Sequence, residues 1–146
     1  MIYSILLVTH LLAAIAFIGT LFFEVVIWHR ARQQLTDAVQ LTADRAIAVT
    51  SRKVLHGVVL LLYGAGISLS WQYRGALSQP LASSFGTLLS LKILLALSII
   101  GHYLMLAYWL THARLSARRA SWIRRSILGH MLLIVILAKA MFHWSY

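Results

Sequence analysis

Long apolar stretches separated by short polar connections dominate the chain. They cover residues 2–28, 54–71, 85–110 and 127–144. Each is close to the ~20 residues that an α-helix needs to cross the hydrocarbon core of a bilayer. A chain in lipid must satisfy its own backbone polar groups, so such stretches are expected to be helical. The pattern therefore predicts an all-α integral membrane protein, an antiparallel four-helix transmembrane bundle that forms one membrane domain, 1–146.

The connections between these stretches are predicted to differ in structure. Within the first, the segment TDAVQLTADRAIAVTSRK can be helical, with Thr36 or Asp37 as its N-cap. The second, RGALSQPLASSFGT, holds the only proline of the chain and is expected to be a loop. The first apolar stretch lacks a basic start and is too long for the core of a secretory signal, so it is interpreted as a span.

Composition and charge favour the same class of protein. Hydrophobic residues make up 61% of the chain and charged residues 11%, with a mean hydropathy of +0.83. The net charge is +10, but the basic residues lie mostly in short connections. This placement favours contact with anionic membrane lipid and argues against nucleic acid as a partner. Cysteine is absent, which excludes disulfides and thiolate-bound metal centres.

The basic residues also predict an orientation. The first and third connections each hold five of them, whereas the second holds only Arg74. The five in each are Arg30, Arg32, Arg45, Arg52 and Lys53, and then Arg114, Arg118, Arg119, Arg124 and Arg125. The positive-inside rule therefore places these two connections in the cytoplasm of a bacterial inner membrane, with both termini on the periplasmic side.

Histidines are the main chemical resource of the predicted spans. Depth, at about 1.5 Å per helical residue, separates the ionisable groups into two layers. The inner layer holds Glu24, His56, His102 and His130, and the outer layer holds His10, Lys92, Lys139 and His143. Ionisable side chains inside a membrane are costly and are usually functional. We therefore take His10 and His102 as the main candidate ligands, with His56, His130 and His143 as partners.

Helical phase and glycine placement add detail to these layers. Residues seven apart share a helix face, and three such stripes combine aromatic and polar side chains that are expected to face the bundle. They are Tyr3, His10, Phe17 and Glu24; His56, Tyr63 and Ser70; and Leu88, Leu95, His102 and Trp109. Glycines at 19, 57, 64, 66, 101 and 129 are predicted to allow close helix packing, or to leave room for a flat ligand.

Three kinds of function fit these residues. Imidazoles on neighbouring helices can bind haem iron from both faces, and Lys92 could hold an acidic propionate. This predicts a b-type haem protein that transfers electrons within or across the membrane and is a candidate oxidoreductase. Its expected partners are a quinone, a redox protein or a second copy of the chain. Copper is an alternative ligand, because imidazole suits it. The third alternative is a non-catalytic membrane subunit whose polar groups fix helix packing. No catalytic residue is predicted.

Several segments resemble known membrane families. THLLAAIAFIGTLFFEVVIWH, with His10 and Gly19, resembles the opening of the copper-resistance D (CopD) membrane domain, and LLSLKILLALSIIGHYLM resembles its third helix. His10, the Trp28–His29 pair, and Lys92 followed by His102 are similar to the four-helix membrane protoporphyrinogen oxidase (HemJ) family. The resemblance implies haem b binding, copper resistance or a related oxidase activity. The second apolar stretch departs from the oxidase family, because it lacks that family's Thr-Pro and Met motif.

Overall fold

The structure is helical throughout the part of the chain that it describes. It is a computed structural model that describes residues 1–112, 116–141 and 143. No strand occurs among these residues. Four helical segments are long and apolar enough to cross a membrane: Ile2–Gln34, Asp37–Gln72, Ser84–Thr111 and Ala117–Ala140. The predicted all-α class, with four such segments, is therefore confirmed.

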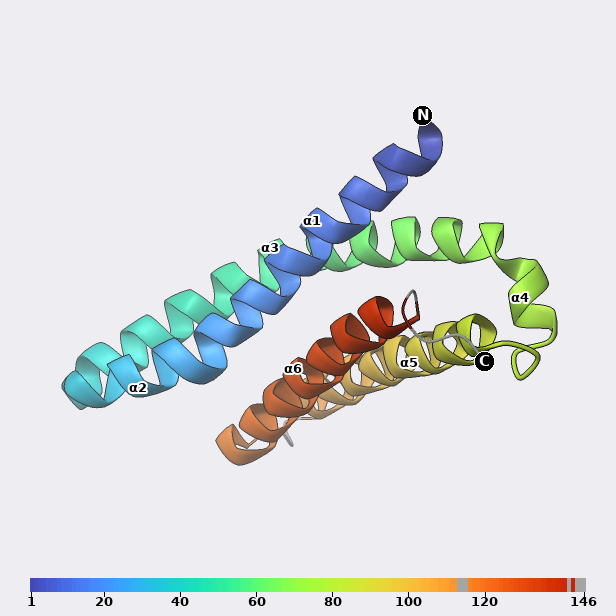
Figure 1. Cartoon of the computed structure of the whole chain (residues 1–146). Helices are drawn as coiled ribbons and strands as arrows, with labels where there is room; N and C mark the ends of the chain where they lie inside the picture. Colours follow the sequence, from blue (N-terminus) through green and yellow to red (C-terminus); the bar gives the residue numbers. More distant parts are fainter. Residues whose placement is uncertain (113–115, 142, 144–146) are drawn as a thin grey trace. The chain divides into compact units, whose positions relative to one another are not determined.

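The chain divides into two compact units, Met1–Gln72 and Tyr73–Tyr146, and each contains one helical hairpin (Figure 1). The first hairpin pairs α1 (Ile2–Phe22) with α3 (Asp37–Gln72). Between them lie a π-helical turn η1 (Phe23–Trp28), a short α2 (His29–Ala31) and a 3₁₀ turn η2 (Arg32–Gln34). The extended backbone of Leu35 ends this run of turns.

The start of α3 agrees with the prediction for the first connection. Gln40 N donates to the carbonyl of Thr36 at 2.9 Å, which places Thr36 at the N-cap position. The helix then continues without a break into the second predicted span. The basic segment 37–53 is thus the first half of α3, because nothing in it forces a helix to end.

Side chains at the reversal between α1 and α3 form a hydrogen-bonded turn cluster. Trp28 Nε1 donates to Asp44 Oδ1 at 2.7 Å, and Arg32 Nη2 lies 2.9 Å from Asp44 Oδ2. Arg32 also donates to Gln40 Oε1, and Gln40 Nε2 donates to the carbonyl of Leu35 at 2.9 Å. Arg32, which is closer to the reversal than Trp28, pairs with Gln40, which is closer to the reversal than Asp44. The cluster therefore fixes an antiparallel register.

Asp44 is expected to be the energetic centre of the turn cluster, because it accepts from both Trp28 and Arg32. Asp44→Ala removes both interactions and should lower the free energy of unfolding by about 1–2 kcal/mol. Asp44→Asn keeps an acceptor for Trp28 and should cost about half as much. Denaturant titration of the purified chain in detergent, followed by circular dichroism, measures both. Equal losses for the two variants would contradict a contribution from the Trp28 hydrogen bond.

The second unit contains α4 (Arg74–Ser78), α5 (Ser84–Thr111) and α6 (Ala117–Ala140). Ser83 caps α5, with its hydroxyl accepting from Gly86 N at 3.1 Å, and Ser116 caps α6 by accepting from Arg119 N at 3.3 Å. These caps explain why both helices begin where they do.

The predicted loop of this unit is wrong in part. The expected loop 74–87 contains α4 and the first turn of α5, and its turn around the proline is short. The predicted fourth span begins at residue 127, whereas the helix that contains it, α6, begins earlier, at Ala117, because Ser116 starts a helix before the arginine-rich segment. The predicted end of that stretch, at residue 144, lies outside the described residues.

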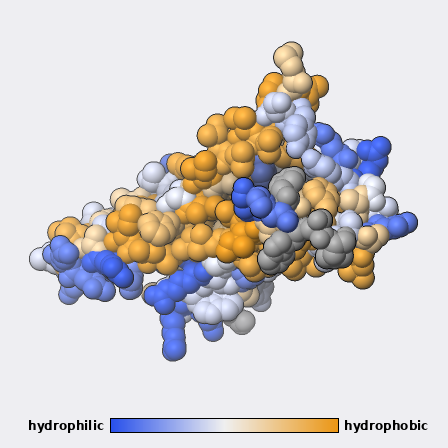
Figure 2. Space-filling view, in the orientation of Figure 1, coloured by the Kyte–Doolittle hydropathy of each residue, from blue (hydrophilic) through white to orange (hydrophobic). Residues whose placement is uncertain are grey.

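The helices of the second hairpin, α5 and α6, pack along each other. Ile123 on α6 has no exposed surface, and the Arg119 guanidinium lies 5.1 Å from the centre of the Trp109 ring at the end of α5. In both hairpins many large apolar side chains point outward, such as Leu60 at 75% exposure and Ile136 at 63%. Figure 2 shows this apolar surface along the helices, with several hydrophilic patches, one of them at the end that carries α2.

Candidate functional site

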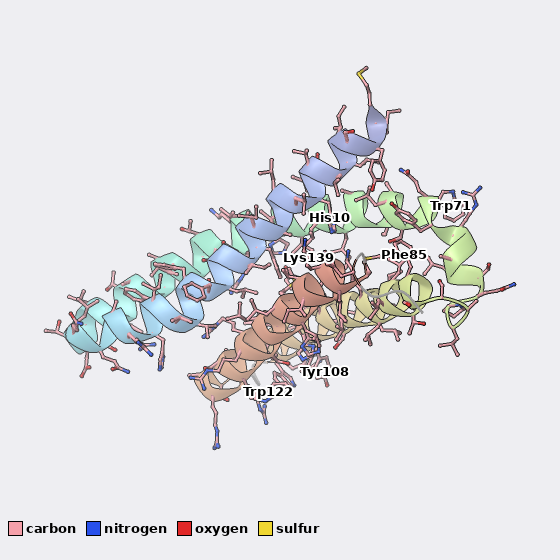
Figure 3. The ribbon with its side chains drawn as sticks, viewed as in Figure 1. His10, Trp71, Phe85, Tyr108, Trp122 and Lys139 are labelled. Atoms are coloured by element: carbon pink, nitrogen blue, oxygen red, sulfur yellow. The ribbon has the colours of Figure 1, made fainter. Side chains whose placement is uncertain are left out.

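His10 lies on α1 where that helix packs against α3 (Figure 3). Its ring Nδ1 is 2.9 Å from the carbonyl oxygen of Leu62 on α3. A carbonyl can only accept, so Nδ1 carries the proton, and the neutral imidazole has its lone pair on Nε2. Metal-ligating histidines commonly donate through one ring nitrogen to a backbone carbonyl, which sets the tautomer and the orientation of the ring.

Gly66 makes this contact possible. It follows Leu62 by one helical turn, where a side chain would cover the Leu62 carbonyl. A Cβ atom at Gly66 would lie 3.0 Å from His10 Cε1 and 3.3 Å from Nδ1. The predicted close helix approach is therefore confirmed at this glycine. At the other five, 19, 57, 64, 101 and 129, an added Cβ would meet no atom within 4 Å, so close packing at these glycines stays a prediction.

Two serines and two histidines of α5 and α6 form a serine–histidine tetrad: Ser98, His102, Ser126 and His130. Each helix contributes a serine followed by a histidine one turn later. The Nδ1 atoms of His102 and His130 each lie 2.7 Å from the carbonyl of the serine on their own helix. Each Nε2 faces the serine hydroxyl of the opposite helix, at 2.9 Å for His102 with Ser126 and 3.3 Å for His130 with Ser98.

The tetrad is a closed hydrogen-bonded arrangement. Both Nδ1 atoms must donate, since their partners are carbonyls, so both neutral rings accept at Nε2 from a serine hydroxyl. The two imidazoles lie edge to face, with ring centroids 5.1 Å apart. Trp122, one turn before Ser126, stacks on His102 at 5.9 Å with an interplanar angle of 28°. Every polar atom of the two rings thus has a partner, and the contacts fix the register of α5 on α6.

As a pair, the tetrad histidines do not fit the two axial positions of one haem iron in this arrangement. Two imidazoles on opposite sides of a metal have ring centres about 6 Å apart, since each nitrogen lies about 2 Å from the metal. The observed 5.1 Å edge-to-face contact is shorter, and both Nε2 atoms are already hydrogen-bonded. Either ring could ligate a metal only after its serine hydroxyl had moved away.

The serines of the tetrad are expected to stabilise the α5–α6 hairpin. Ser126→Ala leaves His102 Nε2 without its donor and should lower the free energy of unfolding by about 0.5–1.5 kcal/mol. Ser98→Ala should cost less, because its contact with His130 is longer. Denaturant titration in detergent micelles measures both losses. Ser68→Ala is the matched control, because Ser68 is exposed and donates only within its own helix, to the carbonyl of Gly64. A loss no larger than the control's would argue against the tetrad.

Each of the remaining predicted ligands lies at another level along the helices than the site in its own unit. His56 is exposed on α3, and its Nδ1 donates to the carbonyl of Arg52. His143 donates to the carbonyl of Lys139 at 3.3 Å, and Lys92 is half-buried on α5. In the part of the chain that the structure describes, no three His, Cys, Asp or Glu side chains are grouped to hold a metal ion. The two predicted layers draw on both units and stay a prediction.

The sequence pattern indicated His56, His130 and His143 as partners of the main candidate ligands, but it gave Ser126 no role. The structure brings His102 and His130 together within one unit. A signal for this pairing is present in the sequence, because a serine precedes a histidine by four residues on both α5 and α6. Asp44, the acceptor in the turn cluster, gave no comparable signal.

No protein-family model, no curated protein and no solved structure matches the chain. The candidate roles of the histidines therefore rest on their geometry and on general coordination chemistry, and the resemblance to the CopD and HemJ families stays a prediction.

Proposed function

We propose that the protein is a multi-pass membrane protein that binds b-type haem and transfers electrons within the membrane. Membrane insertion of the four apolar segments as one bundle explains their outward-facing side chains, since lipid replaces the missing protein contacts. Leu60 on α3, Leu94 on α5 and Ile136 on α6 are each more than half exposed. In water such surface would be costly, at about 25 cal/mol per Å².

The basic segments support an orientation within a bacterial inner membrane. α3 has 36 residues, which is roughly 54 Å of helix and well beyond the ~30 Å hydrocarbon core. Its first half carries Arg45, Arg52 and Lys53, so this half projects into the cytoplasm in the proposed orientation. The start of α6 carries four arginines and lies on the same side, which leaves both termini on the periplasmic side.

His10 carries the proposal for haem. Its Nδ1–H donation to Leu62 orients the ring, and this proposal takes Nε2 as the ligating nitrogen. Gly66 provides the close approach that holds the ring in that orientation. When bound, haem supplies one-electron transfer at its iron. The protein's own contribution is an imidazole whose orientation and tautomer are set before any ligand arrives, and an apolar surrounding for a macrocycle.

The serine–histidine tetrad supports a second role for the same protein, the packing of α5 on α6. All four of its side chains are already engaged with one another or with their own backbone. Interhelical hydrogen bonds of this kind stabilise helix pairs in lipid. In this proposal His10 binds the cofactor while His102 and His130 hold the second hairpin together, so substitutions at the two sites differ in outcome.

The absorbance spectrum of the purified full-length protein tests the proposal. We expect a Soret band near the ordinary b-type position, either as isolated or after addition of haemin, with sharper visible bands after reduction by dithionite. A colourless protein that gains no Soret band with haemin would overturn haem binding. Metal analysis of the same sample distinguishes iron from copper, the alternative ligand. Extraction from membranes by detergent, but not by carbonate, tests insertion independently.

A further inference from the structure

The second unit has an unbalanced charge. Between residues 73 and 146 the sequence holds no Asp and no Glu, whereas it holds eight Lys and Arg. These are Arg74, Lys92, Arg114, Arg118, Arg119, Arg124, Arg125 and Lys139. Five of them fall within Ala117–Ala140, and four of these five, the arginines, lie in the first turns of α6. No carboxylate side chain of this unit can neutralise that segment, so anionic groups from elsewhere must do so.

The first turns of α6 have two distinct faces. Ala120, Ile123 and Ile127 are buried, at 8%, 0% and 5% exposure. Arg118 and Arg125 are exposed on another face, and Trp122 between them is 57% exposed. Arg118, Trp122 and Arg125 follow the spacing of one helix face, and the two arginine positions lie roughly 10 Å apart along the axis. We call these three residues the arginine–tryptophan stripe.

The chemistry of the stripe fits a phosphodiester at a membrane surface. A guanidinium presents parallel N–H donors that match two phosphate oxygens. An indole prefers the boundary between hydrocarbon and water, where its ring is apolar and its N–H is hydrated. The stripe lies at the start of a helix whose later part is apolar enough to cross a membrane. Trp122 lies near the start of α6 (Figure 3), and its ring stacks on His102 of α5.

We propose that Arg118, Trp122 and Arg125 form a binding site for the headgroups of anionic phospholipids. The inference rests on the proposed insertion of α6 in a membrane, but not on haem binding. The two guanidinium groups contact lipid phosphates, and the indole packs against the adjoining glycerol and acyl region. Because Trp122 also stacks on His102, a bound headgroup holds the indole against the serine–histidine tetrad.

Native mass spectrometry of the detergent-solubilised full-length protein tests this site. Phosphatidylglycerol and phosphatidylcholine with identical acyl chains are added in turn, and retained lipid per protein is counted. We expect the wild-type protein to prefer phosphatidylglycerol by roughly tenfold. The double variant Arg118→Gln/Arg125→Gln should lose most of that preference. Trp122→Ala should weaken retention of both lipids while leaving the preference.

Matched variants separate the stripe from a general charge effect. Arg74→Gln/Lys139→Gln makes the same change in net charge in the same unit and should leave the preference intact. Arg118→Lys/Arg125→Lys keeps the charge but loses the bidentate donors, so we expect a lipid preference between those of the wild type and the glutamine pair. This lysine pair also serves as a second variant in case the glutamine pair fails to fold.

Four outcomes would overturn the site. The first is an unchanged preference for phosphatidylglycerol in the glutamine pair, and the second is an equal loss of that preference in the Arg74 and Lys139 control. The third is displacement of phosphatidylglycerol by inorganic phosphate at the same concentration as the lipid. The fourth is tighter binding of a DNA duplex than of phosphatidylglycerol. A protein that carbonate extracts from membranes would instead refute the proposed insertion, so the two failures can be distinguished.

Discussion

Replacing His10 with alanine is expected to abolish the Soret band of the haem-loaded protein. The substitution removes the imidazole that lies against Gly66 and whose Nε2 is the proposed ligand. Loss of an axial ligand typically costs far more affinity than loss of a packing contact, and we expect haem affinity to fall at least tenfold. Titration of the apoprotein with haemin, followed by absorbance, gives that affinity for both proteins.

Two controls distinguish ligation from a structural role of His10. Free imidazole added to His10→Ala should restore part of the Soret band, because it can occupy the space that the side chain left. His29→Ala removes an exposed histidine from α2 and should leave the spectrum unchanged. If His10→Ala binds haemin with wild-type affinity, His10 is not a ligand. If His102→Ala rather than His10→Ala removes the band, the proposed division of roles between the two sites is wrong.

Gly66→Ala should produce a milder form of the same defect. The added methyl group would lie 3.0 Å from His10 Cε1, so the ring must shift by a few tenths of an ångström and its bond to Leu62 weakens. We expect haem affinity to fall by a smaller factor than in His10→Ala, measured by the same haemin titration. Gly64→Ala is the matched control on α3, because nothing lies within 4 Å of a Cβ at that position.

The helical content of the chain followed from its hydropathy pattern, but the limits of the helices did not. A run of apolar residues marks where a helix can cross lipid, whereas caps and chain reversals mark where it begins and ends. The polar segment 37–53 continues into the second span because its residues are adequate helix formers. In the same way, the cap at Ser116 lets α6 begin in the arginine-rich segment, well before its apolar part. Such extensions are invisible to a search for apolar stretches.

In the candidate sites, the sequence pattern predicted which helix face a side chain lies on, but not which residue of the neighbouring helix it contacts. Helical phase placed His10 and Phe17 on one face of α1, and Phe17 is buried at 4% exposure. The same stripe also included Tyr3, which is 40% exposed and lies at the N-terminal end of α1, where α1 and α3 diverge (Figure 1). The pairing of His102 with Ser126 depends on the register between α5 and α6, which the pattern of either helix alone does not contain.

Ile123→Ala is expected to be the most destabilising substitution in the second unit. Among the residues that the structure describes, Ile123 is the large side chain with no exposed surface, and it lies between the buried Ala120 and Ile127 on α6. Removing three of its carbon atoms leaves a cavity and should lower the free energy of unfolding by about 2–5 kcal/mol. The loss applies in lipid as well as in water, because the packing of helices in a membrane depends on close contacts. Denaturant titration of the purified protein measures it.

Ile136→Ala provides the matched control for this prediction, since it makes the same chemical change on the same helix. Ile136 is 63% exposed, so the atoms that it loses face lipid or detergent and leave no cavity. We expect a loss well below 1 kcal/mol. The difference between the two variants measures how tightly α5 and α6 pack at the level of Ile123. Similar losses of unfolding free energy at both positions would mean that α6 has no well-packed side. They would also contradict the register between α5 and α6 on which the tetrad, one turn further along, depends.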